Sequence, residues 1–157
     1  SWTRASRIDW GTILLFGGGL SLGRLMFTTG LAERIGRGLI ATSGAESLWM
    51  VTAVMTAVAI LTTEVTSNTA ATNMLVPVAL AVAKAAGISP LPPALGIAFG
   101  ASMAYMLPIS TPPNAIVYGS GLVPVTDMIR CGLLLDLFSF LVIITGLRLL
   151  CPVLGLL

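Results

Sequence analysis

Two short groups of polar side chains interrupt an otherwise apolar sequence, and their types suit binding rather than catalysis. TSNTAATN spans residues 66–73, and PISTPPN spans residues 108–114. Hydroxyl, amide and carbonyl oxygens are the ligands that hard cations prefer, whereas hydroxyls with free backbone N–H groups hold carboxylate or sulfate oxygens. The chain has no histidine and no Ser-Lys or Cys-His pairing. Because acid-base and nucleophilic catalysis lack their usual groups, we expect no enzyme.

The composition predicts that these polar groups lie inside a membrane. Of 157 residues, 56% are hydrophobic and 9% are charged, and the mean hydropathy is +1.00. These values are typical of an integral membrane protein. The net charge of +2 comes from scattered residues, so no nucleic-acid partner is indicated. Cys131 and Cys151 have no C-x-x-C or histidine partner, which favours unpaired thiols and no metal site other than one for sodium.

The first 46 residues predict one span and one surface helix. Residues 10–28 are long enough to cross a bilayer, within a segment 1–29. The glycines at 17–19 favour close helix packing, since no G-K-[ST] follows for a phosphate loop. Residues 30–40, within a segment 30–46, have apolar residues on one face and charged residues on the other. That pattern indicates an amphipathic helix in the membrane interface.

The stretch from Leu48 to Ala86 is too long to be one spanning helix. As a single helix its 39 residues would measure about 58 Å, against about 30 Å of hydrocarbon. The polar cluster at 62–69 falls near its centre and leaves two short arms. We therefore predict a re-entrant hairpin within residues 47–89, with Ser67, Asn68 and Thr69 at its tip and Asn73 supporting the tip. Non-helical backbone at that depth requires a cavity or surrounding protein.

Residues 90–123 predict a second interruption, and residues 124–157 a final span. The apolar run from Pro90 reaches Leu107 and is then broken at Pro112 and Pro113, which cannot donate the backbone hydrogen bonds of a continuous helix. We expect a broken transmembrane helix there. In the last segment, VPVTDMIR reads as a polar turn or interfacial helix before the span. The predicted class is an all-α integral membrane protein.

Helix ends within a membrane carry partial charges that bind ions. The helix starting after Asn68 offers free N–H groups to an anion, and carbonyls around residues 63–66 with the Asn68 side chain suit a cation. The broken helix offers carbonyls at residues 107–111 and free amides from Asn114 onward. Discontinuous helices of this kind recur in secondary transporters.

The order of the motifs resembles one transporter family. LLFGGGLSLGRLMFTTGLAERIG, TEVTSNTAATNMLVPVALAVA, AYMLPISTPPNAIVYGSG and DMIRCGLLLDL are similar to the C-terminal half of the divalent anion/sodium symporters, which include sodium-coupled dicarboxylate and citrate transporters. The resemblance covers nearly the whole chain. It implies an elevator-type transporter with two inverted repeats, of which the N-terminal repeat, with most of the dimer scaffold, is absent here. It also implies a homodimer for the full-length protein in a plasma membrane, such as a bacterial inner membrane, with several spans.

The resemblance also implies roles for individual residues. Substrate binding would involve Ser67, Asn68, Thr69, Thr111 and Pro112. Sodium, the co-transported ion, would be bound by Thr63, Thr66, Asn68 and Ser110, largely through backbone carbonyls. Supporting positions would be Asn73, Pro113 and Asn114. No organic cofactor is expected. The implied function is sodium-coupled symport of a small dianion, such as succinate, malate or fumarate, across the lipid bilayer.

Several alternatives stay open at the level of sequence. The substrate could instead be sulfate or citrate, and the chain could be a non-transporting fragment or one half of a split assembly.

The roles of single residues also stay open. Glu64 is either a proton or cation site or a brace for the hairpin. Asp136 and Arg24 are expected to pair or to snorkel at a helix end, with a part in coupling as the alternative. Hydroxyls within helices are expected to bond the carbonyl four residues earlier: Thr52, Thr56 and Thr145.

Overall fold

The chain between Ser47 and its C-terminus folds as a bundle of α-helices. In this computed structural model, residues 47–157 are described, together with positions 2, 14, 17, 18, 21, 24, 25, 28–31, 34 and 38 of the first 46. The predicted span at 1–29 and arm at 30–46 therefore fall mostly outside the described residues. Within residues 47–157 every regular element is a helix, as the sequence predicts. The five helices are α4 (Leu48–Thr63), α5 (Asn68–Ala86), α6 (Leu91–Gly100), α7 (Pro112–Gly119) and α8 (Val125–Val153).

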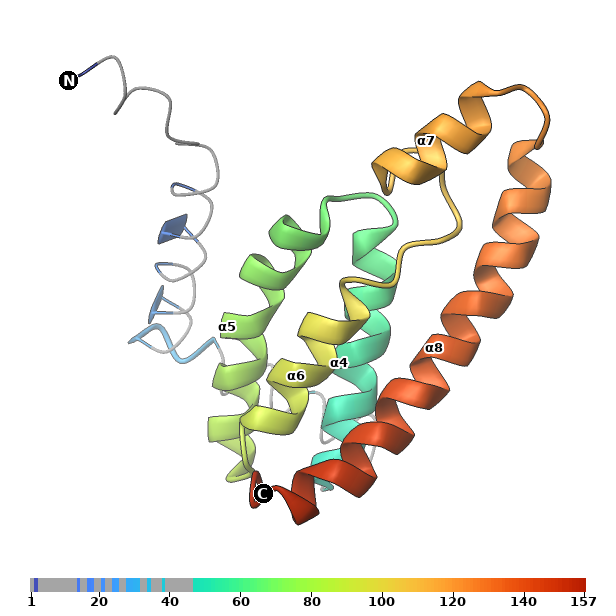
Figure 1. Cartoon of the computed structure of the whole chain (residues 1–157). Coiled ribbons are helices and arrows are strands. Elements are labelled where there is room, and N and C mark those ends of the chain that lie inside the picture. Colours follow the sequence, from blue (N-terminus) through green and yellow to red (C-terminus); the bar gives the residue numbers. More distant parts are fainter. Residues whose placement is uncertain are drawn as a thin grey trace.

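Helices α4 and α5 run antiparallel on either side of the SNT sequence (Figure 1). The Ser47 hydroxyl caps α4 by accepting from the N–H of Met50. The chain reverses at residues 64–67, and Ser67 caps α5 by accepting from the N–H of Ala70. Helix α5 ends at Gly87, whose φ of 68° is the left-handed conformation that only glycine adopts without strain. That the pair enters and leaves a membrane on the same side stays a prediction.

Helix α6 packs closely against α4 through glycines. A Cβ on Gly100 would lie 3.0 Å from the backbone oxygen of Thr56, and one on Gly96 would collide with the Thr56 hydroxyl. Small residues four apart let two helices approach in this way. The hydroxyls of Thr52 and Thr56 bond the carbonyls of Leu48 and Thr52, at 2.8 and 2.7 Å, which confirms the prediction for these two. Their hydrogen bonds are thus satisfied within α4 at a buried interface.

The helix that starts at the 90–93 prolines ends earlier than the sequence suggests. We expected it to continue to Leu107, but α6 ends at Gly100 and no helix follows until α7 begins at Pro112. Residues 101–111 form turns and irregular chain instead. We refer to residues 101–111 as the unwound segment. Pro112 and Pro113 occupy the first two positions of α7, where a missing N–H costs nothing.

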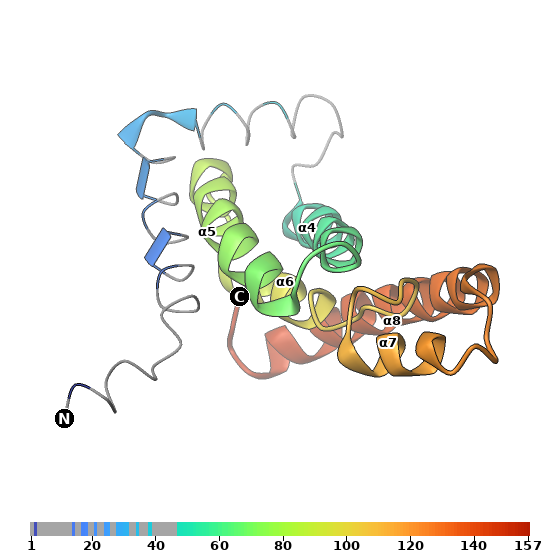
Figure 2. The same ribbon diagram turned by 90° about the horizontal axis from the view of Figure 1, so that it is seen from above.

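Helix α8 is one long helix that begins before the predicted span. It starts at Val125, so residues 125–130, which the sequence predicts as part of a polar turn or an interfacial helix, form its first turns. Asp127 lies in that first turn, where a negative charge is stabilised by the helix dipole. The 29 residues of α8 extend about 43 Å, more than the thickness of a bilayer core. Seen from above, α8 lies beside α4 and α6, on the side away from α5 (Figure 2).

Two described helices are long and apolar enough to cross a membrane. They are α5, with a mean hydropathy of 1.4, and α8, with 2.2. Only 11% of the apolar window of α8 is buried within the chain. Its outer face exposes large side chains such as Leu134, Phe138 and Leu141. This face would be shielded from water by lipid or by further protein.

Candidate functional site

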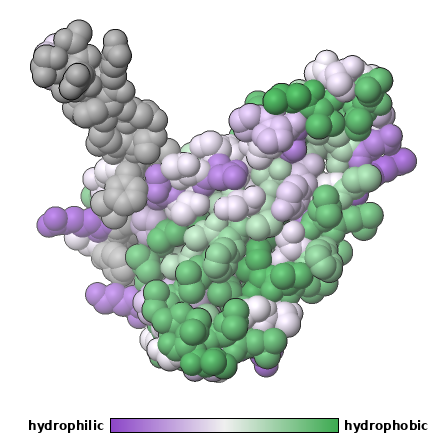
Figure 3. Space-filling view, viewed as in Figure 1, coloured by the Kyte–Doolittle hydropathy of each residue, from purple (hydrophilic) through white to green (hydrophobic). Residues whose placement is uncertain are grey.

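The predicted site residues gather at one end of the bundle. The 64–67 turn and the start of α7 lie at the same end of the molecule (Figure 1), and Figure 3 shows more hydrophilic surface there than over the opposite end. Two groups form: one at the hairpin tip and one where the unwound segment joins α7. Each group has its own internal hydrogen bonds, described in turn below.

At the hairpin tip, Thr63 and Asn68 bring oxygen atoms together. The Thr63 hydroxyl oxygen lies 2.7 Å from Oδ1 of Asn68 and 2.6 Å from the carbonyl oxygen of Ala101. A hydroxyl has only one hydrogen, so it can donate to one of these two acceptors at a time. Thr63 is buried. The geometry leaves oxygen lone pairs converging at the junction of α4, α5 and the unwound segment, as a hard cation requires.

The other predicted residues of the tip have different surroundings. The Thr66 hydroxyl donates to the Thr62 carbonyl at 2.9 Å, and the exposed Ser67 serves as the cap of α5. Thr69 and Asn73 lie one turn apart on α5, so they share a face. Together with Asn68, they contribute to an open cavity of about 260 Å³. This cavity is lined by Asn68, Thr69, Thr72, Asn73 and Ser102.

At the second group, Asn114 ties the unwound segment to α7. Its side-chain amide donates to the carbonyls of Ala104 and Leu107, at 3.0 and 3.1 Å, and lies 3.1 Å from the Ser110 hydroxyl. The Thr111 hydroxyl caps α7 by accepting from the N–H of Asn114 at 3.4 Å. These hydrogen bonds hold the unwound segment and the start of α7 together around Ser110 and Thr111.

One of the carbonyls that the broken helix was expected to offer, that of Leu107, already accepts hydrogen bonds. The carbonyl oxygen of Leu107 accepts from both the N–H and the hydroxyl of Ser110, at 3.2 and 2.6 Å, and from Asn114. A carbonyl oxygen has two lone pairs, so Leu107 has none left for a cation. The buried Ser110 thus uses its hydroxyl internally and retains only its own carbonyl for an ion.

Glu64 joins the two groups. Its Oε1 accepts from the backbone N–H groups of Tyr105 and Met106, at 2.7 and 2.9 Å, and its Oε2 accepts from that of Leu107 at 2.9 Å. The side chain is only 3% exposed. Three charge-assisted bonds from unwound backbone are what a buried carboxylate needs. Of the two roles open from the sequence, the structure shows bracing.

Some residues of the site were not predicted. Thr72 and Ser102 line the cavity, and the carbonyl of Ala101 contacts Thr63. Thr72 could have been found, because it lies one turn after Asn68 and so shares its helix face. Ser102 and Ala101 could not, since they lie on the tip only because α6 ends at Gly100. The described part of the structure shows no direct hydrogen bond between the Thr63–Asn68 group and the Ser110–Asn114 group.

Comparisons with known proteins show the family to which the chain belongs. Residues 1–157 match the family described as the sodium:sulfate symporter transmembrane region. An uncharacterized transporter from Haemophilus influenzae is 39% identical over 146 residues, which cover 92% of this chain and 32% of that protein.

Two relatives carry functional names. The sodium-dependent dicarboxylate transporter SdcS of Staphylococcus saprophyticus is 38% identical over 96% of this chain, and that of Staphylococcus aureus is 37% identical over 91%. The chain spans 29% and 27% of these two proteins, so it corresponds to less than a third of their length. The matched relatives are transporters rather than enzymes. The chain thus belongs to the sodium:sulfate symporter family of integral membrane proteins, the divalent anion/sodium symporters.

Proposed function

We propose that this chain forms a C-terminal part of a longer sodium-coupled symporter for small dianions, with C4 dicarboxylates such as succinate, malate or fumarate as substrates. The observation that carries the proposal is the position of Asn68. Its Oδ1 lies 2.7 Å from the Thr63 hydroxyl, and the same side chain lines the cavity next to Thr69. Asn68 thus contacts the oxygen cluster at Thr63 and also lines the polar cavity at the start of α5. A residue in this position could contact both a bound cation and a bound anion, as coupled transport requires.

The cavity supports a small ligand held by neutral groups. Its volume of about 260 Å³ is somewhat below the roughly 300 Å³ at which pockets for small molecules usually begin. The side chains that line it are amides and hydroxyls. A dianion would be held by these groups and by the first N–H groups of α5, which point out of the helix and carry its positive partial charge. Ser67, Thr111 and Pro112 would complete this half of the site.

Sodium would be bound beside Asn68. The ligands in this proposal are the oxygens of Thr63, Thr66, Asn68 and Ser110, with the Ala101 carbonyl as an addition that the structure suggests. Sodium bound here would bring together the end of α4, the start of α5 and the unwound segment. Its positive charge would strengthen binding of an anion in the adjacent cavity. This gives a physical basis for coupling.

The rest of the transporter would come from outside this chain. The relatives are about three times longer, and we propose that an N-terminal inverted repeat supplies a matching hairpin and broken helix. In this view α6 and α7 are the two halves of one broken transmembrane helix and the α4–α5 pair is re-entrant. The complete protein would be a homodimeric elevator in the plasma membrane.

Competition for uptake would define the substrate. The complete transporter, reconstituted in liposomes, would take up labelled succinate along an inward sodium gradient, and unlabelled malate, fumarate, citrate and sulfate would be added in turn. We expect malate and fumarate to compete most strongly. Because the matched family is described by sodium and sulfate, sulfate is the second candidate. Stronger competition by sulfate than by any dicarboxylate would favour it.

A further inference from the structure

The polar cavity beside the hairpin tip extends along α5 from its first turn to its second. Asn68 and Thr69 line it at the start of the helix, Thr72 and Asn73 line it one turn further on, and Ser102 lines it from the unwound segment. Four residues separate Asn68 from Thr72, which is about 6 Å along the helix axis. The two ends of the cavity can therefore contact different parts of one small ligand.

The end of the cavity at the start of α5 offers hydrogen-bond donors. The N–H groups of Asn68 and Thr69 belong to the first turn of the helix, where no carbonyl four residues earlier lies within the helix. The Ser67 hydroxyl accepts from the N–H of Ala70 instead. The Thr69 hydroxyl has no hydrogen-bond partner among the described residues, so its hydrogen is available as well. A carboxylate, which only accepts hydrogen bonds, fits this end.

The end of the cavity one turn further along offers acceptors. The Thr72 hydroxyl donates its hydrogen to the Asn68 carbonyl at 2.9 Å, and the Ser102 hydroxyl donates to the Ala98 carbonyl at 3.1 Å. A hydroxyl has one hydrogen, so both oxygens can only accept a bond from a ligand. The N–H of Ser102 bonds the Phe99 carbonyl. Turning the Ser102 hydroxyl into the cavity would therefore leave the Ala98 carbonyl unpaired at the end of α6.

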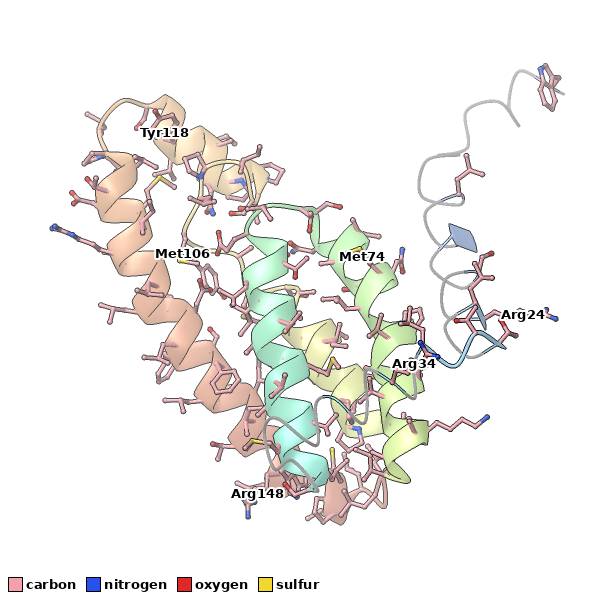
Figure 4. All side chains as sticks on the ribbon, turned by 180° about the vertical axis from the view of Figure 1, so that it is seen from behind. Arg24, Arg34, Met74, Met106, Tyr118 and Arg148 are labelled. Atoms are coloured by element: carbon pink, nitrogen blue, oxygen red, sulfur yellow. The ribbon has the colours of Figure 1, made fainter. Side chains whose placement is uncertain are left out.

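The described residues that line the cavity are all neutral. Lys84 lies in the last turn of α5, and Arg148 lies at the end of the bundle opposite the hairpin tip (Figure 4). A carboxylate beside Thr72 and Ser102 would face two oxygens that only accept, with no basic lining residue to offset the repulsion. A ligand group that donates a hydrogen bond fits there instead. Asn73 accommodates either kind of group, because its amide both donates and accepts.

We propose that Thr72 and Ser102 form a subsite for a hydroxyl group of the ligand, so that the preferred dianion is a hydroxylated C4 dicarboxylate such as malate. This inference rests on the proposed function and names the substrate of that same site. One carboxylate accepts from the donors at the start of α5, and the hydroxyl group on the carbon chain donates to Thr72 or Ser102. Succinate displaces water from these two acceptors without replacing its hydrogen bond, which weakens its binding.

Competition between matched ligands tests the subsite. The complete transporter in liposomes would take up labelled succinate along a sodium gradient, against unlabelled malate or methylsuccinate, which carry a hydroxyl or a methyl group on the same carbon. Malate should compete at a roughly fivefold lower concentration, as expected for one net hydrogen bond. Ser102→Ala and Thr72→Val should each lower this preference, and the double variant should abolish it. Ser120→Ala and Thr62→Val should keep it, because their hydroxyls bond carbonyls at 2.6 and 2.7 Å and do not line the cavity.

The possible outcomes separate this inference from the proposed function. Equal competition by malate and methylsuccinate, or a preference that survives in the double variant, would overturn the inference while sodium-driven succinate uptake still supports the proposed function. An equal loss of affinity for both competitors in Thr72→Val, which leaves the end of α6 unchanged, would also overturn it, since Thr72 would then support the fold alone. So would a change confined to the sodium dependence, because the acceptors would then bind a cation. Absence of sodium-driven succinate uptake in the unmodified protein would contradict the proposed function and this inference with it.

Discussion

The carboxylate of Glu64 and the backbone N–H of Leu107 lie 2.9 Å apart, although 43 positions separate the two residues. This bond and its two neighbours at Tyr105 and Met106 connect the SNT hairpin to the segment that precedes α7. The side chain of Glu64 therefore holds the SNT hairpin and the unwound segment, which carry the two halves of the candidate site, in a fixed relative position. Movement of one half would be transmitted to the other through the Glu64 side chain.

Replacing Glu64 with Gln should loosen this support. The amide keeps one acceptor oxygen but loses the charge, so at least one backbone N–H is left without a partner. The loss of a charge-assisted bond at a buried position costs about 1.5–3 kcal/mol. We expect a lower apparent Tm of the purified transporter and a lower maximal uptake rate. An unchanged Tm together with unchanged uptake would show that the three bonds have no structural role.

Replacing Gly132 with Ala should separate α8 from the unwound segment. The new Cβ would lie 2.5 Å from Cα of Met106, a distance that forces backbone to move, and overpacking of this kind costs about 1–3 kcal/mol. Gly146→Ala on the same helix is the matched control, because its Cβ would meet nothing within 4 Å. Thermal unfolding should distinguish the two variants. Equal Tm values would contradict the close packing at Gly132.

Replacing Thr63 with Val removes a hydroxyl at nearly constant volume. Asn68 and the Ala101 carbonyl then lose a contact of 2.7 and 2.6 Å, respectively. We expect the sodium concentration for half-maximal uptake to rise by about tenfold, which corresponds to about 1.4 kcal/mol. Thr62→Val is the control, since the Thr62 hydroxyl bonds the Val58 carbonyl within its own helix. If both variants shift the sodium dependence equally, Thr63 has no specific part in it.

The sequence was sufficient to predict the elements whose signals are local. The length of the run from Leu48 to Ala86 requires a reversal, and the chain does reverse beside Ser67, which caps α5 through its own side chain. The threonine hydroxyls of α4 behave as their position in a helix predicts. Pro112 marks the start of α7 for a similar reason, because proline suits the first turn of a helix.

The features that were missed depend on contacts between distant residues. Residues 101–107 contain Ala, Met and Leu, which favour helix, but the carboxylate of Glu64 binds three of their N–H groups and keeps this backbone unwound. The burial of Asp136 in the middle of α8, where neither carboxylate oxygen has a hydrogen-bond partner among the described residues, likewise depends on how α8 packs. No local pattern around either residue specifies it, so tertiary structure decides both.

Replacing Pro112 with Ala should affect site geometry more than membrane insertion. Proline fixes φ at the first position of α7, and Ala restores an N–H and freedom to the segment that carries Thr111. We expect a normal amount of protein in the membrane and a reduced maximal uptake rate. Pro124→Ala, at the N-cap of α8, should leave uptake within about twofold, a difference of roughly 0.4 kcal/mol. A variant of Pro112 that transports normally would show that the rigid start of α7 is dispensable.

The double role of Asn68 is the central claim, and sodium-driven uptake measures it most directly. The complete transporter and its Asn68→Ala variant would be reconstituted in liposomes, and uptake of labelled succinate would be recorded while sodium and succinate are varied independently. Because the Asn68 side chain contacts the Thr63 oxygen and lines the cavity, the variant should have weaker apparent affinity for both ions. Uptake that does not depend on a sodium gradient, or a variant with unchanged affinity for both sodium and succinate, would contradict the account.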